Sequence, residues 1–124
     1  MIAGIGLDLI EIERVADSLS RHGMAFAERI LSPGEDVERV RAQEGATHLA
    51  GLFAAKEAVM KALGTGMAGA AFKDIAILNR PGGEPFVRLS GRAEETAAKR
   101  GIRDWKISIT HSRTMAAAVA IALA

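Results

Sequence analysis

The chain has 124 residues, of which 49% are hydrophobic and 25% charged, so we expect one ordinary folded domain over residues 1–124 rather than a disordered or fibrous protein. Its 16 basic and 15 acidic side chains leave a formal net charge of +1, which excludes the broad basic surface typical of nucleic-acid or membrane binding. Cysteine is absent, so disulfides, thiolate metal sites and cysteine nucleophiles are excluded as well.

The beginning of the chain predicts a short strand followed by a helix. Apolar residues at positions 2, 5, 7 and 9, separated by glycines, are typical of a buried strand, and Asp8 stands near its end. Helical spacing then predicts an amphipathic helix over residues 10–23. Asp8, Glu11 and Glu13 interrupt the apolar start, which also lacks a basic region, so we expect no export signal and a cytoplasmic protein.

Three more helices are predicted before a glycine-rich loop. A short one covers residues 26–31, and Ser32, Pro33 and Glu35 form a capping-box pattern that predicts a helix from there to about Arg41. The strongest helical pattern covers residues 47–63 and is expected to end at Gly64 and Gly66. The glycines of residues 64–69 make a loop that could admit a ligand.

The second half alternates strands and a helix. Residues 74–78 and 85–89 predict a hairpin around a turn-rich loop, residues 91–100 a helix, and residues 105–110 and 114–123 a final strand pair. The order indicates a mixed α and β protein without internal repeats. Because aromatic residues make up only 4%, aliphatic side chains and alanine must fill the core.

One pair of charges on the long helix is a candidate site. Glu57 and Lys61 are four residues apart and share a helix face, which Ala50 and Ala54 extend with small side chains that leave room for a ligand. The pair is either a solvated surface ion pair or part of a phosphate site. In the second interpretation Asp8 joins Glu57 in holding a magnesium ion, and Lys61 neutralises a bridging phosphate.

Two segments resemble the signature motifs of the holo-acyl-carrier-protein synthases, a phosphopantetheinyl transferase family. They are Gly4-Ile5-Gly6-Leu7-Asp8 and Phe53-Ala54-Ala55-Lys56-Glu57-Ala58-Val59-Met60-Lys61-Ala62-Leu63-Gly64-Thr65-Gly66. Three further segments are similar to the family: Phe26-Ala27-Glu28-Arg29-Ile30-Leu31-Ser32, Phe72-Lys73-Asp74-Ile75 and Ile107-Ser108-Ile109-Thr110-His111-Ser112. The resemblance covers nearly the whole chain, with both signatures in order and at family spacing.

The resemblance implies an α/β (α+β) fold in which a small antiparallel or mixed sheet packs on one long helix and shorter helices. It implies a homotrimer with coenzyme A bound between neighbouring subunits. The implied reaction is magnesium-dependent transfer of 4′-phosphopantetheine from coenzyme A to a serine of an apo acyl carrier protein. Adenosine 3′,5′-bisphosphate is released, and the product supports fatty acid biosynthesis.

The resemblance also implies roles for particular residues. Asp8 and Glu57 would bind Mg²⁺, and Lys61 would contact the phosphates and assist the leaving group, so these three would be catalytic. The serine proton would leave through Glu57 or a metal-bound water. The residues implied at the nucleotide are Lys61, Gly64, Thr65, Gly66, His111 and Ser112. Arg14 and Arg21 would meet the carrier protein.

Two positions depart from the family pattern, and both lack a positive charge. Leu52 stands where many relatives have an arginine, which removes one expected contact to the 3′-phosphate unless Arg41 or Lys73 replaces it. Ala25 stands where relatives often have a basic residue, which leaves Arg21 and Arg29 as candidates for the carrier contact.

Two other functions fit the same residues. The first is another metal-assisted phosphoryl enzyme, such as a small nucleotide hydrolase, which would release free phosphate. The second is a catalytically silent nucleotide-binding or assembly subunit that has kept the fold. The presence of Asp8, Glu57 and Lys61 argues against the second.

Overall fold

The computed structural model describes residues 1–64 and 71–124. Its elements, in chain order, are β1 (Ile2–Glu11), α1 (Ile12–His22), α2 (Met24–Ile30), α3 (Val37–Arg41), α4 (Gly45–Leu63), the 3₁₀ turn η2 (Phe72–Asp74), β2 (Ile75–Asn79), β3 (Pro85–Leu89), α5 (Gly91–Lys99), β4 (Asp104–His111) and β5 (Met115–Leu123). Each predicted helix and strand is present, although some boundaries differ. The first strand was predicted to bury its apolar residues, but Ile2, Ile5, Leu7 and Leu9 are 63–66% exposed.

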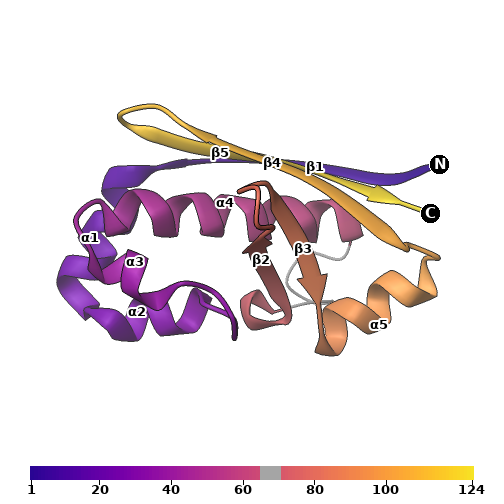
Figure 1. Cartoon of the computed structure of the whole chain (residues 1–124), viewed down its shortest axis with the longest axis horizontal. Helices are drawn as coiled ribbons and strands as arrows, with labels where there is room; N and C mark the ends of the chain where they lie inside the picture. The colour runs from indigo at the N-terminus through magenta and orange to yellow at the C-terminus, as the bar shows by residue number, and fades with distance from the viewer. Residues whose placement is uncertain (65–70) are drawn as a thin grey trace.

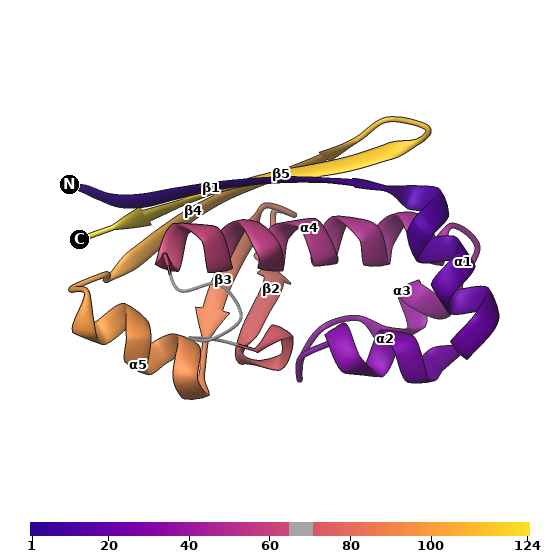
Figure 2. The same ribbon diagram turned by 180° about the vertical axis from the view of Figure 1, so that it is seen from behind.

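Two antiparallel sheets and one central helix set the architecture. The larger sheet has the strand order β1-β5-β4, and β2 and β3 form a separate hairpin. Helix α4 runs along one face of the larger sheet, with α1, α2 and α3 gathered towards one end and α5 at the other (Figures 1 and 2). The predicted α/β fold, with a small antiparallel sheet packed on one long helix, is confirmed.

Alanine brings β5 close to α4. Along β5 the buried residues alternate with partly buried ones, as expected for a strand with one face on the core. The buried residues are Ala116, Ala118, Ala120 and Ala122. Helix α4 adds Ala54, Ala55, Ala58 and Ala62, each at most 2% exposed. The prediction that alanine and aliphatic side chains fill the core is therefore confirmed.

Two glycines allow β1 to lie directly against α4. A Cβ atom at Gly4 would come within 2.1 Å of Ala62 O, and one at Gly6 would come within 1.8 Å of Ala58 O. Real Cβ atoms do not approach oxygen so closely, so only glycine permits this contact. Because alternate residues of a strand share a face, Asp8 is the next side chain of β1 to face the helix. The Gly-x-Gly-x-Asp spacing thus places the carboxylate of Asp8, a residue of β1, against α4.

A Gly6→Ala substitution is expected to destabilise the protein by about 1–3 kcal/mol, the usual cost of overpacking a core. The added methyl group would push β1 away from Ala58. Urea unfolding would measure the change, with Gly82→Ala as the matched control because no atom lies within 4 Å of a Cβ there. Equal losses of stability in the two variants would contradict the close strand–helix contact.

Two predicted boundaries are wrong. Strand β1 does not end near Asp8 but continues to Glu11, which pairs with Met115, so Asp8 lies inside the ladder opposite Ala118. The expectation of a carboxylate at a strand-to-helix junction is therefore incorrect, and α1 begins only at Ile12. The third helix begins at Val37 rather than near Ser32, because the carboxylate of Asp36 caps it by accepting from Arg39 N at 3.1 Å.

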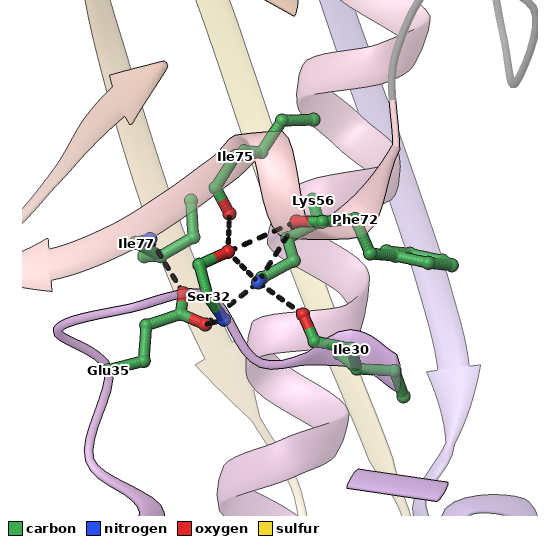
Figure 3. A network of polar contacts seen from close by, with 7 residues as sticks. All are labelled: Ile30, Ser32, Glu35, Lys56, Phe72, Ile75 and Ile77. Atoms are coloured by element: carbon green, nitrogen blue, oxygen red, sulfur yellow. Dashed lines mark hydrogen bonds and ion pairs between the residues drawn. The ribbon is translucent and has the colours of Figure 1, made fainter. Parts of the chain in front are cut away.

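The residues that resemble a capping box belong instead to a buried polar network around Lys56 (Figure 3). The Lys56 side chain is fully buried, and its ammonium donates to Ile30 O at 2.5 Å, Ser32 Oγ at 2.9 Å, Glu35 Oε1 at 2.8 Å and Phe72 O at 3.2 Å. Burial lowers the pKa of Lys56, and the Glu35 carboxylate opposes that shift. The ammonium of Lys56, a residue of α4, therefore connects the loop that follows α2 to the 3₁₀ turn η2.

The same network also holds the hairpin. Glu35 Oε2 accepts a hydrogen bond from Ile77 N at 2.8 Å, and Ser32 Oγ donates one to Ile75 O at 3.0 Å. Glu35 Oε1 also accepts from Ser32 N at 2.7 Å, the contact that a capping box would make at a helix start. The capping-box pattern therefore predicts this one hydrogen bond correctly. In the structure, however, Glu35 starts no helix and instead connects β2 to Lys56 of α4.

In the part of the chain that the structure describes, no helix combines the length and apolar character needed to cross a membrane.

Candidate active site

Asp8 and Lys61 meet at the contact between β1 and α4. Lys61 Nζ lies 3.2 Å from Asp8 Oδ1 and donates to Leu7 O at 2.8 Å. The Asp8 side chain is 16% exposed, whereas that of Lys61 is 52% exposed. The Asp8 carboxylate is thus held by the Lys61 ammonium, and that ammonium remains accessible to an anionic ligand. The structure thus brings Asp8 and Lys61 together, as the phosphate-site interpretation requires.

Glu57 lies on α4 one turn before Lys61 and completes the acidic pair. Its side chain is half-buried, and the pKa of Glu57 is raised by burial first and by the nearby negative charge of Asp8 second. Lys61 lowers the pKa and partly offsets both effects. The ion pair of Lys61 is with Asp8 rather than with its helical neighbour Glu57. Two carboxylates therefore compete for one cation, which leaves this cluster short of positive charge.

Removing the charge of Glu57 is expected to stabilise the metal-free protein near neutral pH. A raised pKa means that the folded state binds the proton more tightly than the unfolded state. The resulting stability is present below the ordinary value of 4.5 and is lost as the pH rises through the folded pKa. Thermal unfolding of Glu57→Gln should therefore give a higher Tm than wild type at neutral pH and a smaller difference in acid. A lower Tm at neutral pH would contradict the unfavourable burial.

The small residues predicted to leave room beside Glu57 do not do so. Ala50 and Ala54 are completely buried in the core, so that expectation was wrong. Gly64 ends α4 as predicted, with a left-handed φ of 78° and its N–H donating to Met60 O and Lys61 O. It is exposed and follows directly on the turn that carries Lys61. The predicted contacts of Thr65 and Gly66 lie outside the described residues.

His111 and Ser112 lie apart from the acidic pair. His111 lines a groove of about 380 Å³ that also includes Arg39, His48 and Leu52. Leu52 and Lys61 are nine residues apart on α4, so at 3.6 residues per turn they point to opposite sides of the helix. Ser112 Oγ accepts from Thr114 N at 3.2 Å and Met115 N at 3.0 Å, which orders the turn between β4 and β5.

Arg39 was not predicted from the sequence to belong to a site. It is the arginine that lines the groove next to Leu52. The pKa of the half-buried His48 is lowered by burial first and by the charge of Arg39 second. Neither replacement considered above lines this groove: Arg41 pairs with Glu38 at 2.9 Å, and Lys73 lies by a separate hollow beside Ala25. On a short polar helix nothing in the sequence distinguishes Arg39 from Arg41.

The two arginines predicted to meet a partner lie on α1. Arg14 is exposed and lines a hollow of about 370 Å³ together with Asp8, Phe26 and Phe53. Arg21 is also exposed and lies in the last turn of the same helix. The hollow therefore joins a basic side chain and two aromatic rings to the carboxylate of the candidate site.

Comparison with known proteins finds relatives that match nearly the whole chain. Residues 4–120 match the family model described as the 4′-phosphopantetheinyl transferase superfamily. A curated holo-[acyl-carrier-protein] synthase of Vibrio vulnificus is 46% identical over 121 residues, covering 97% of this chain and 96% of the relative. One of Aliivibrio fischeri is 48% identical over 122 residues, covering 97% and 96%.

Solved structures give the same result. The holo-[acyl-carrier-protein] synthase of Neisseria meningitidis superposes with a TM-score of 0.91 at 34% identity and covers both chains completely. That of Helicobacter pylori, solved in complex with coenzyme A, has a TM-score of 0.81 at 35% identity, covering 96% of this chain and 99% of that one. The chain therefore belongs to the holo-[acyl-carrier-protein] synthases of the 4′-phosphopantetheinyl transferase superfamily.

Proposed function

We propose that this protein transfers the 4′-phosphopantetheine group of coenzyme A to a serine of an apo acyl carrier protein. The observation that carries the proposal is the cluster of Asp8, Glu57 and Lys61, which combines two carboxylates with one open ammonium group. Support for the substrates comes from the relatives: they are named for the carrier protein, and a Bacillus anthracis synthase was solved with coenzyme A (3′,5′-ADP).

The donor set fits Mg²⁺. This ion is usually held by one or two carboxylates together with substrate phosphates, rather than by a complete cage of protein ligands. Asp8 and Glu57 supply such a pair, and the pKa of Glu57 is raised by burial first and by the charge of Asp8 second. Among residues 1–64 and 71–124 no group of three or more histidine, aspartate or glutamate side chains forms a fuller site. Bound there, Mg²⁺ would offset charge on the pyrophosphate oxygens.

Lys61 is proposed to act on the leaving group. The serine oxygen forms a bond to the phosphorus that carries pantetheine, and the bond from that phosphorus to the oxygen of adenosine 3′,5′-bisphosphate breaks. Negative charge then develops on the departing phosphate, and the exposed ammonium of Lys61 can stabilise it. The serine proton leaves through Glu57 or through water.

The nucleotide site is proposed to need a second copy of the chain. His111 lines a groove with Arg39 and His48 on the side of α4 opposite Lys61, so one subunit would supply the acidic pair and another the groove, with Ser112 in the turn that follows His111. Strand β1 offers the contact surface: Ile5, Leu7 and Leu9 are 63–66% exposed on the sheet face opposite α4. These observations support the homotrimer, with coenzyme A between subunits.

The carrier protein is proposed to bind at α1. Acyl carrier proteins would approach the hollow beside Asp8, where Arg14 supplies positive charge and Phe26 and Phe53 supply apolar surface. Arg21 extends the basic character of the same helix. Gly64, at the end of α4, is proposed to lie beside the nucleotide. A cytoplasmic location and a role in fatty acid biosynthesis stay predictions.

Product analysis separates this proposal from its alternatives. Purified protein, coenzyme A and Mg²⁺ should release adenosine 3′,5′-bisphosphate only when an apo carrier protein is present, as chromatography of the nucleotides would show. Release of free phosphate without a carrier would instead favour a nucleotide hydrolase. Binding of coenzyme A without any product would favour a silent assembly subunit.

A further inference from the structure

Arg100 donates to three backbone carbonyls on the two elements that carry the candidate site, α4 and β1. It follows directly after α5, and its Nη1 donates to Ala62 O at 2.9 Å and to Leu63 O at 2.5 Å. Its Nη2 donates to Ala3 O at 2.9 Å. One guanidinium therefore bridges the last turn of α4 to the first residues of β1.

The chemistry of the contact favours arginine in particular. The last carbonyls of a helix have no partner within the helix, and they carry the negative end of its dipole. A cation with N–H donors placed there pairs with these carbonyls and offsets the negative end of the dipole. Arg100 does so for two carbonyls of α4. The rigid planar fork also reaches a third carbonyl on β1, which a single lysine ammonium cannot reproduce in the same geometry.

The contact lies at the same strand–helix boundary as the acidic pair. Lys61 joins α4 to β1 at Leu7 and Asp8, and Arg100 joins them at Ala3. Between these two cations, Gly4 and Gly6 hold the backbones of β1 and α4 in contact. Arg100 also touches the end of α4, since a Cβ at Gly64 would lie 3.4 Å from its Nη1.

We propose that Arg100 is a positioning residue for the transfer reaction. It fixes the last turn of α4 against β1, so that the ammonium of Lys61 stays beside Asp8 and close to the phosphate that departs. This inference rests on the proposed function, because it assigns Arg100 to that reaction. The residue has no contact with Asp8 or Glu57 and acts only through the backbone.

The test compares three variants of the full chain at a temperature well below their Tm. Arg100→Gln removes the contact, Arg100→Lys keeps the charge without the fork, and Lys99→Gln is the matched control one residue earlier at the end of α5. Steady-state transfer gives kcat and the KM for the carrier protein. Amide hydrogen exchange at Lys61 and Gly64 reports directly on the end of α4.

For Arg100→Gln we expect kcat to fall about tenfold, less than the ~100-fold that a 1 Å misplacement of reacting groups can cost. Exchange at Lys61 and Gly64 should become faster, and the KM for the carrier should not change. Arg100→Lys should lie between Arg100→Gln and wild type, and Lys99→Gln should match wild type.

Three outcomes would overturn the inference. Faster exchange with an unchanged kcat would show that Arg100 only stabilises the fold. A lower kcat with unchanged exchange would show that it acts in some other way than by holding α4. A wild-type protein that transfers nothing would reject the proposed function itself, and the assignment of Arg100 to it would fall for that separate reason.

Discussion

Asp8→Asn is expected to lower the rate of phosphopantetheine transfer by roughly 100-fold or more, the usual loss when one charge that stabilises a transition state is removed. The amide keeps the shape of the side chain, but it removes one of the two carboxylates and the ionic partner of Lys61. The fold should survive, because Asp8 is only partly buried and its neighbours Gly4 and Gly6 are unchanged.

A second measurement links this loss to the proposed site. Because the charge of Asp8 helps to raise the pKa of Glu57, carboxyl NMR of Asp8→Asn should show the pKa of Glu57 moving down towards its ordinary value. Asp17→Asn on the exposed face of α1 serves as control and should change neither quantity. Turnover at the wild-type rate in Asp8→Asn would reject the assignment of the site.

The largest effect on stability is expected at Lys56. Lys56→Met should lower the free energy of unfolding by about 3–5 kcal/mol, because it leaves the carboxylate of Glu35 buried without its cation. Domains of this size are stable by only about 5–15 kcal/mol, so the variant should unfold at much lower urea concentrations. Substitution of the exposed Lys99 should change stability by about 0.5 kcal/mol or less.

The double variant Lys56→Met, Glu35→Gln provides the internal check. Replacing the stranded carboxylate by a neutral amide removes the uncompensated charge, so the double variant should be more stable than Lys56→Met alone. Residues in one network show such coupling, whereas independent sites add. Losses that simply add would mean that the Lys56–Glu35 ion pair does not hold the network together.

The fold was largely predictable because most of it follows local rules. The spacing of apolar residues and the glycine at position 64 predicted a helix over residues 47–63, and α4 spans Gly45–Leu63. The same holds for the hairpin strands and for β5, whose patterns depend on a few neighbouring residues. The errors occurred where a distant partner decided the structure. Pairing with β5 extends β1 beyond Asp8 to Glu11, and no residue near Asp8 indicates this.

The capping-box error has the same cause. Ser32 and Glu35 have the local pattern of a helix start. Instead, both side chains accept hydrogen bonds from the buried ammonium of Lys56, which lies more than 20 residues later in the chain. In the sequence Lys56 resembles any other lysine of a family motif. Its complete burial depends on how α4 packs against the loop and the hairpin, which only the three-dimensional structure shows.

The candidate site also has one part that the sequence could predict and one part that it could not. The approach of Asp8 to Lys61 could be expected from the two motifs, and the structure adds that close packing at Gly4 and Gly6 brings it about. The position of His111 across α4 and the contribution of Arg39 could not be expected. They depend on which elements border the second groove rather than on any spacing along the chain.

Intact-protein mass spectrometry of an apo acyl carrier protein is the most direct test of the proposed transfer. The carrier is incubated with this protein, coenzyme A and Mg²⁺, and a parallel sample contains EDTA. We predict that the carrier gains the mass of one phosphopantetheine group in the first sample and none in the second. If several apo carriers gain no mass while coenzyme A still binds, the protein is not a phosphopantetheinyl transferase for them, and the central claim is wrong.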